Sequence, residues 1–424
     1  MSDLSSPVAV VGAGVSGLAC AVHLHEAGVP VQVFEAGREV GGRVRTDFVD
    51  GFRIDRGFQV LPTAYPEVQA MLDLGALALG RFTPGALVRH GGRFARFLDP
   101  ARNPRELPRT LGSGVMPLAD QLRVLALRRR ASRGTLAELY ARPERPALAW
   151  LRERGFGAAA IERFFRPFFA GIFLERELAT SSRLLEFAFR SFALGDAALP
   201  AEGMGAIPRQ LAARLPDGAV RTRAPVEEIE AGALLVAGER IEAEAIVVAT
   251  DGETARRFVP ALPALRHNAT ACLSFAAEAD PVREPVLVLD GEVSGPVNHL
   301  CVPSTVAPSY APAGQALVSA STIGNPAESD AALERAARAQ LAGWFGGAVA
   351  GWRLLRIDRV ACAIPRQPVG WLDPVERTVQ LGPRLFVCGD HRDIGSLHGA
   401  LHAGRRAAHA VAAALGGAQE RRAS

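Results

Sequence analysis

Short apolar runs interrupted by glycines open the chain and predict an α/β unit. Residues 7–11 form a β-branched run of the kind found in buried parallel strands. Apolar residues recur at helical spacing over 18–24, and the pattern stops at Gly28, which is typical of a helix C-terminus. A second apolar run over 31–34 predicts another strand. This order of strand, helix and strand predicts a parallel βαβ unit at the N-terminus.

Farther along, the hydrophobic pattern predicts two more buried strands and two regions of different character. Residues 244–250 and 385–388 are short apolar runs. Residues 161–194 are dense in Phe and Leu and predict packed helices, or one wall of an apolar tunnel. The second of these regions alternates strand-like runs, over 286–289 and 316–321, with one helix over 330–344. The chain is therefore expected to form more than one lobe, as its 424 residues also suggest.

The turn between the first strand and the first helix carries a recognisable chemistry. It is a GxGxxG segment over 12–17. Its glycines allow a tight turn, a close approach of the backbone to a pyrophosphate, and close packing of helix on strand. The helix N-terminus offers free N–H groups and a positive dipole end to phosphates. Glu35 ends the second strand, where a carboxylate accepts hydrogen bonds from ribose hydroxyls and disfavours the 2′-phosphate of NADP.

A second glycine-rich segment follows at once and favours FAD over NAD. Gly41, Gly42 and Arg43 come just after the second strand. Two glycines and a guanidinium make another anion cradle, as a longer dinucleotide with a flavin end requires. The N-terminal region is therefore predicted to bind FAD.

This set of motifs resembles the flavin-containing amine oxidase superfamily, which includes monoamine oxidases, protoporphyrinogen oxidases and phytoene-type carotenoid desaturases. The resemblance continues over 51–60, 200–211, 224–229 and 389–400. It implies an α/β fold: a glutathione-reductase-like FAD-binding Rossmann domain with a mixed-sheet substrate domain and a helical insertion. The implied FAD-binding domain is discontinuous. Its expected parts are 1–75, 200–262 and 355–424, with the helical insertion over 76–199 and the substrate domain over 263–354.

The resemblance also implies which residues hold the cofactor. Gly57 would bring the chain close to the flavin ring, and the Gly-Asp pair at 389–390 would lie near the ribityl chain. His398 is expected beside the pyrimidine edge of the flavin, where it would act in catalysis or serve only as a polar residue at a helix start. The expected cofactor-binding residues are Gly12, Ala13, Gly14, Ser16, Gly17, Glu35, Ala36, Gly42, Arg43, Gly57, Phe58, Gln59, Val226, Gly389, Asp390, Ser396, Leu397 and Ala400.

The absence of lysine narrows the reactions that this resemblance implies. All 48 Lys or Arg positions are arginine, whereas amine oxidases of the superfamily commonly use a lysine that holds water at the flavin. The expected reaction is instead FAD-dependent oxidation (desaturation) of a hydrophobic substrate by hydride transfer to flavin N5, as in carotenoid and phytoene desaturases. Amine or protoporphyrinogen oxidation is an alternative, and so is a non-catalytic flavin- or lipid-binding chaperone. The electron acceptor would be oxygen or a quinone.

A basic segment in the middle of the chain indicates which partners the protein could contact. Residues 81–166 hold 18 Arg and 7 acidic residues in a chain of net charge +4. Such a segment suits peripheral contact with an anionic membrane, or a solvated face, and it lacks the motifs of nucleic-acid binding. The arginines expected to face lipid are Arg123, Arg128, Arg129, Arg130 and Arg133.

Cysteine usage and hydropathy bear on the compartment. Five scattered cysteines form no CxxC pair, and no set of residues has metal-ligand spacing. No run reaches the ~18 apolar residues of a membrane span. A cytoplasmic protein without a structural metal, peripherally attached to a membrane at most, is therefore expected.

Overall fold

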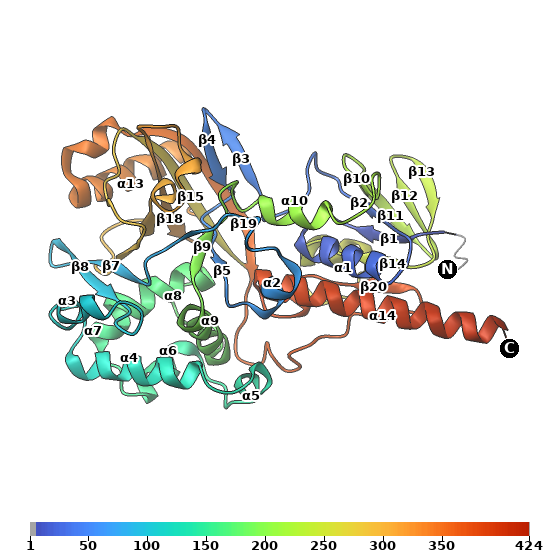
Figure 1. Ribbon diagram of the computed structural model, residues 1–424, viewed down its shortest axis with the longest axis horizontal. Coiled ribbons are helices and arrows are strands. Elements are labelled where there is room, and N and C mark those ends of the chain that lie inside the picture. The colour runs from blue at the N-terminus through green and yellow to red at the C-terminus, as the bar shows by residue number, and fades with distance from the viewer. Residues whose placement is uncertain (1–5, 424) are drawn as a thin grey trace.

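A five-stranded parallel sheet organises one end of the molecule (Figure 1). The computed structural model describes residues 6–423, and the side chains of residues 6–416. In spatial order the strands are β10 (Val220–Arg221), β2 (Val31–Phe34), β1 (Val8–Val11), β14 (Ile246–Val248) and β20 (Leu385–Val387). All neighbours pair in parallel, and the central strands are fully buried. Four of the five lie where the apolar runs predict strands.

Two helices from opposite ends of the sequence pack together on this sheet (Figure 1). They are α1 (Val15–Glu26) and α14 (Leu397–Ala423). A Cβ built on Gly404 would lie 2.3 Å from Ser16 O, so the two backbones touch where only glycine fits. A Cβ on Gly17 would lie 2.0 Å from Gly12 O, which ties α1 equally closely to the turn after β1. These contacts show that the two ends of the chain pack together on one sheet, as the sequence predicts.

A small antiparallel sheet covers the opposite face of the parallel sheet. Ala9, Val11 and Phe34, which alternate with the side chains beneath α1, pack against Leu234 and Val236. The small sheet consists of β11 (Val226–Glu230), β12 (Ala233–Val236) and β13 (Glu239–Glu242).

A seven-stranded mixed sheet forms the other end of the molecule, with α13 (Asp330–Phe345) packed on it (Figure 1). Its neighbours are antiparallel except for β16 and β7, which run in parallel. In spatial order the strands are β19 (Arg353–Pro365), β15 (His267–Ala277), β18 (Ala316–Ile323), β17 (Val297–Cys301), β16 (Leu287–Asp290), β7 (Gly85–His90) and β8 (Arg93–Leu98). This confirms the predicted mixed sheet.

Two segments belong to the mixed sheet, although the sequence predicts that they lie in other domains. β7 and β8 come from the region expected to be a helical insertion, yet they extend the mixed sheet. Residues 355–365, grouped by sequence with the FAD-binding domain, belong to β19 of the same sheet. The division of the chain into domains otherwise stays a prediction.

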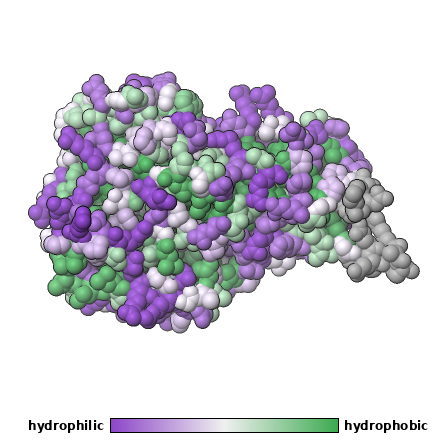
Figure 2. Space-filling model, viewed as in Figure 1, coloured by the Kyte–Doolittle hydropathy of each residue, from purple (hydrophilic) through white to green (hydrophobic). Residues whose placement is uncertain are grey.

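The helical insertion forms a layer beneath the mixed sheet in Figure 1 and presents apolar side chains outward (Figure 2). On α4, Leu118, Leu122 and Leu125 are 57%, 58% and 40% exposed, whereas Asp120 is buried. This arrangement reverses the usual burial of an amphipathic surface helix. The helices are α3 (Leu107–Leu111), α4 (Leu118–Ala131), α5 (Leu136–Tyr140), α6 (Ala147–Glu153), α7 (Ala158–Ala160), α8 (Arg166–Phe173) and α9 (Ser182–Leu194), with a π-helical turn at Ile161–Phe165.

Short elements connect the lobes. They are β3 (Thr46–Val49), β4 (Phe52–Asp55), β5 (Leu61–Pro62), α2 (Pro66–Met71), β6 (Gly80–Arg81), β9 (Ala197–Leu199), α10 (Ala206–Ala212), α11 (Gly252–Phe258) and α12 (Pro303–Val306). Among the helices within residues 6–423, none is both long and apolar enough to cross a membrane.

Candidate functional site

The two glycine-rich segments meet at the carboxyl ends of β1 and β2. Glu35 lies at this edge, and its two oxygens accept the N–H groups of Ala13 at 2.8 Å and Gly37 at 2.7 Å. Gly41 N–H donates to Ala13 O at 2.8 Å, which places the second segment directly beside the first. Each oxygen of Glu35 retains a further lone pair for a ribose hydroxyl.

Two features at the start of α1 fit the pyrophosphate of FAD. Ser16 Oγ is buried and has no hydrogen-bond partner among the described residues. It lies in the first helical turn, where free N–H groups attract anions. A Cβ built on Gly14 would meet no protein atom within 4 Å, so the space beside this backbone is open to a ligand. A buried hydroxyl without a partner is costly unless a ligand satisfies it.

Arg43 joins the N-terminal motif to the C-terminal one. Its Nη2 lies 2.6 Å from Asp390 Oδ1, and its Nη1 donates to Ala363 O at 2.9 Å. Burial of Asp390 by itself would raise the pKa of this carboxyl, but the charge and the hydrogen bond of Arg43, with smaller contributions from His391 and His267, together leave the pKa below its ordinary value. Asp390 is therefore held ionised, and Arg43 fastens the Gly389–Asp390 turn to the N-terminal segment.

The segment expected beside the flavin ring separates the cofactor side from the substrate side. Gln59 Nε2 donates to Arg43 O at 2.8 Å. The ring of Phe58 lies 5.3 Å from that of His299 and 6.3 Å from that of Phe82, on the wall of an apolar cavity. Phe58 thus contributes to the substrate side as well as to the predicted cofactor site.

The remaining predicted cofactor residues lie near the same two edges. Ser396 Oγ accepts the N–H of Gly399 at 3.0 Å and caps α14, whose first turn holds Leu397 and Ala400. Val226 begins β11, Ala36 follows Glu35, and a Cβ on Gly42 would lie 3.5 Å from Gly14 Cα. Their contacts with the cofactor stay predictions.

His398 lies in an aromatic cluster and does not line the cavity. Its ring is 5.7 Å from that of Tyr65, 5.6 Å from that of Phe187 and 6.0 Å from that of His402. Its Nδ1 accepts the N–H of Glu67 at 3.4 Å, and burial lowers the pKa of the imidazole to about 4. The catalytic role proposed from sequence stays a prediction, and these surroundings favour the alternative of a packed polar residue.

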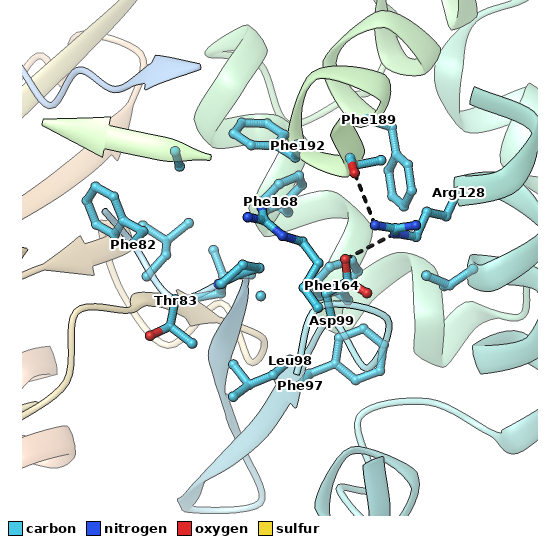
Figure 3. Close-up of a pocket in the computed structure, with 18 of the residues that line it drawn as sticks. Phe82, Thr83, Phe97, Leu98, Asp99, Arg128, Phe164, Phe168, Phe189 and Phe192 are labelled. Atoms are coloured by element: carbon cyan, nitrogen blue, oxygen red, sulfur yellow. Dashed lines mark hydrogen bonds and ion pairs between the residues drawn. The ribbon is translucent and has the colours of Figure 1, made fainter. Parts of the chain in front are cut away.

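A cavity of about 370 Å³ lies between the helical insertion and the mixed sheet (Figure 3). Its size is that of a small-molecule site. The Phe-rich region contributes to it only in part, because Phe165, Phe169 and Phe173 face the core instead. The phenylalanines that line it are Phe58, Phe82, Phe97, Phe164, Phe168, Phe189 and Phe192.

The charged side chains at the cavity are already paired (Figure 3). Arg128 Nε donates to Asp99 at 3.1 Å, and its Nη2 donates to Ala193 O at 3.0 Å. Arg102 donates to Gly195 O at 2.7 Å and pairs with Asp196. The cavity therefore offers a largely neutral surface to its ligand.

The arginines expected to face lipid do not all do so. Arg128 lines the cavity, and Arg130 pairs with buried Glu186 at 3.2 Å, so the expectation is wrong for these two residues. Their charge faces inward because buried or half-buried carboxylates attract it. Arg123, Arg129 and Arg133 are exposed, as expected.

Sequence reasoning missed His299, which lines the cavity from β17. It also missed the leucines of α3 and α4 at the cavity entrance. The spacing of Leu118, Leu122 and Leu125 on one helix face was a signal for these, but an apolar stripe more often faces a core. A single histidine between apolar residues gave no comparable signal.

Comparison with known families gives one match across the chain. The sequence model of the flavin containing amine oxidoreductases matches residues 15–412. This match confirms the predicted family, the FAD cofactor and, at the level of the family, the oxidoreductase class.

Individual relatives match over short segments. The chain is 50% identical over 66 residues to protoporphyrinogen oxidase 2 of Arabidopsis thaliana, covering 16% of this chain and 13% of that one. It is 48% identical over 58 residues to carotenoid 3,4-desaturase of Haloarcula japonica, covering 13% and 12%. It is 48% identical over 52 residues to hydroxysqualene dehydroxylase of Sinorhizobium fredii, covering 12% of each. These matches span about an eighth of each relative's length.

Solved structures show the same fold over nearly the whole chain. A protein of Exiguobacterium, provisionally named protoporphyrinogen oxidase, superposes with a TM-score of 0.74 at 18% identity, covering 96% of this chain and 99% of that one. An oxidoreductase from Methanosarcina mazei gives 0.72 at 18% identity, covering 94% and 99%. At this identity the likeness describes the fold.

Proposed function

This chain belongs to the flavin-containing amine oxidoreductase family, and we propose that it oxidises a large, apolar, uncharged substrate with FAD, as desaturases do. The observation that carries this proposal is the phenylalanine-lined cavity, which Phe58 places next to the segment expected beside the flavin. Bound FAD supplies a hydride acceptor at N5. The chain then needs only to exclude water and to hold the reacting C–H bond in line, and packed aromatic rings do both.

The compensated charges of the cavity favour a neutral substrate over the alternatives. A tetrapyrrole would bring carboxylates, and an amine would bring a cation. Asp99 is paired with Arg128, and Arg102 shares Asp196 with the exposed Arg81, so each charged side chain that lines the cavity already has a partner of opposite charge. A neutral hydrocarbon needs no group of opposite charge in the cavity. Protoporphyrinogen and amine oxidation therefore become the weaker candidates.

Mixing the holoprotein with candidate substrates without oxygen tests this proposal. Micellar 4,4′-diapophytoene should bleach the flavin band near ~450 nm, whereas protoporphyrinogen and benzylamine should leave it unchanged. Added oxygen or a quinone should restore the band. Bleaching by benzylamine alone would contradict the proposal. Reduced flavin that neither oxygen nor quinone reoxidises would favour a non-catalytic carrier.

The cavity entrance also supports a proposed contact with an anionic membrane. We call Leu107, Leu111, Leu118, Leu122 and Leu125 the leucine patch. These side chains are 40–58% exposed, and all except Leu118 also line the cavity. Figure 2 shows this hydrophobic region over α3 and α4. Exposed apolar side chains with arginines around them suit an interfacial site, and an apolar substrate would pass from lipid directly into the cavity. The exposed arginines nearby on α3 and α4 are Arg109, Arg123 and Arg129.

Flotation with anionic vesicles tests the leucine patch. We expect Leu118→Glu to reduce the bound fraction at least about 10-fold, because it removes an exposed apolar side chain that lipid would cover and adds a charge that anionic lipid repels. Val293→Glu is the matched control, since Val293 is also 57% exposed but lies in the loop after β16. Binding that is equally strong for both variants, or unaffected by salt, would contradict the membrane contact.

A further inference from the structure

His299 is a polar side chain in the inner, buried wall of an otherwise apolar region of the cavity. It is 4% exposed, and its neighbours Leu287 and Leu289 on β16 line the same wall. Its ring lies 5.3 Å from that of Phe58, which places it at the end of the cavity nearest the segment expected beside the flavin.

The hydrogen bonds of Asn298 fix which nitrogen of His299 carries the proton. Asn298 Nδ2 donates to Pro167 O at 2.8 Å, so this atom must be the amide nitrogen and not the oxygen. The same atom lies 3.1 Å from His299 Nδ1. Because both atoms cannot donate in this contact, Nδ1 accepts the second amide N–H. The proton of the neutral ring therefore lies on Nε2.

The Nε2–H group is left as a donor without an acceptor. Within the described range 6–416, the His299 ring makes one hydrogen bond, that of Nδ1 with Asn298, and Nε2 makes none. Burial lowers the pKa of His299 to about 4, so the ring is neutral across the physiological range. The cavity thus presents one oriented N–H donor near its inner end, among aromatic and aliphatic side chains.

We propose that His299 determines specificity by donating its Nε2–H to a single oxygen on an otherwise apolar substrate. This inference rests on the proposed function and narrows it from apolar molecules in general to those with one hydroxyl or carbonyl group. An oxygen at this point satisfies a donor that a pure hydrocarbon would leave unpaired, and sites of this kind discriminate against analogues that lack the oxygen. Asn298 acts as the positioning residue, because it holds the tautomer that donates.

Binding of a matched pair of ligands to the FAD-loaded protein tests the proposal. Hydroxysqualene and squalene differ by one hydroxyl group, and calorimetric titration in the same detergent micelles gives the dissociation constant of each. We expect the wild type to prefer the alcohol about 10-fold, the magnitude of one net hydrogen bond. The preference should not change between pH 8 and pH 5, because the ring stays neutral there.

Variants separate the hydrogen bond from a merely structural effect. His299→Phe should bind both ligands equally and keep the wild-type affinity for squalene. His299→Gln, which retains an N–H donor, should recover part of the preference and covers the case in which the Phe variant folds poorly. Asn298→Leu should weaken the preference without contact with the ligand. His90→Phe, on the distant end of β7, should behave as the wild type.

The outcomes show separately whether the inference about His299 fails and whether the proposed function fails. Equal binding of both ligands by the wild type, or an unchanged preference in His299→Phe, overturns the inference and leaves the proposed function intact. If neither ligand binds, both the inference and the proposed function are overturned. A preference that is lost in His299→Phe and partly regained in His299→Gln supports the donor role.

Discussion

Gly14→Val is expected to abolish FAD binding while the apoprotein keeps its stability. Gly14 has φ −70° and ψ 171°, an extended conformation that valine adopts readily. Because a Cβ at this position meets no protein atom within 4 Å, the fold tolerates it. The same Cβ occupies the space that the pyrophosphate needs at the start of α1. The flavin-to-protein ratio should therefore fall at least about 10-fold, with the free energy of unfolding of the apoprotein within about 0.5 kcal/mol of wild type.

Gly17→Val is the comparison variant, because it should lower the stability of the apoprotein whereas Gly14→Val should not. A Cβ on Gly17 would lie 2.0 Å from Gly12 O, so this variant should destabilise the apoprotein itself. Gly343→Ala, at an exposed site within α13, is the control and should keep full flavin content. Flavin absorbance and urea unfolding of the apoproteins measure both effects. A Gly14→Val protein that retains flavin would place the cofactor elsewhere. One that unfolds as easily as Gly17→Val would contradict the open space beside Gly14.

The cofactor half of the molecule could be predicted because its signals are local. The turn at 12–17 and the acid at Glu35 have a fixed geometry that follows from their own sequence. The sequence predicted that the segments around Arg43 and Asp390 lie in the same domain, but it did not predict their ion pair. Two residues 347 positions apart show no local pattern that identifies them as partners. The bridge itself required the structure.

The substrate half was predicted less well because its features depend on packing. In β7 and β8 the arginines Arg89, Arg93 and Arg96 interrupt the apolar alternation, which hid this hairpin. The π-helical turn at Ile161–Phe165 shifts the phase of the following helix. Among the phenylalanines of the cavity, Phe164 and Phe168 lie in this turn and in the helix that follows it, and the aromatic content alone does not reveal which way they face. The donor on His299 likewise depends on Pro167, which is distant in sequence.

Acid should destabilise the protein through His398, and His398→Gln should remove that contribution. Burial lowers the pKa of His398 to about 4 in the folded state, against about 6.5 for the unfolded chain. The unfolded state therefore binds a proton first as the pH falls. The stabilisation is fully present above pH 6.5 and is lost progressively between 6.5 and 4. A difference of this size corresponds to about 3 kcal/mol in the free energy of unfolding.

Urea unfolding of the wild type and of His398→Gln at several pH values between 8 and 4 measures this contribution. Glutamine keeps an acceptor for the N–H of Glu67 but cannot titrate, so the variant should lose about 3 kcal/mol less than the wild type over this range. His25→Gln, on the exposed side of α1, is the control.

His398→Gln also tests whether His398 takes part in catalysis. If His398 is a packed residue in the cluster of Tyr65 and Phe187, the bound flavin should keep its spectrum and its rate of reduction by substrate. A loss of reduction rate that follows pH would instead make His398 an acid or base of the reaction, because packing alone gives no such dependence.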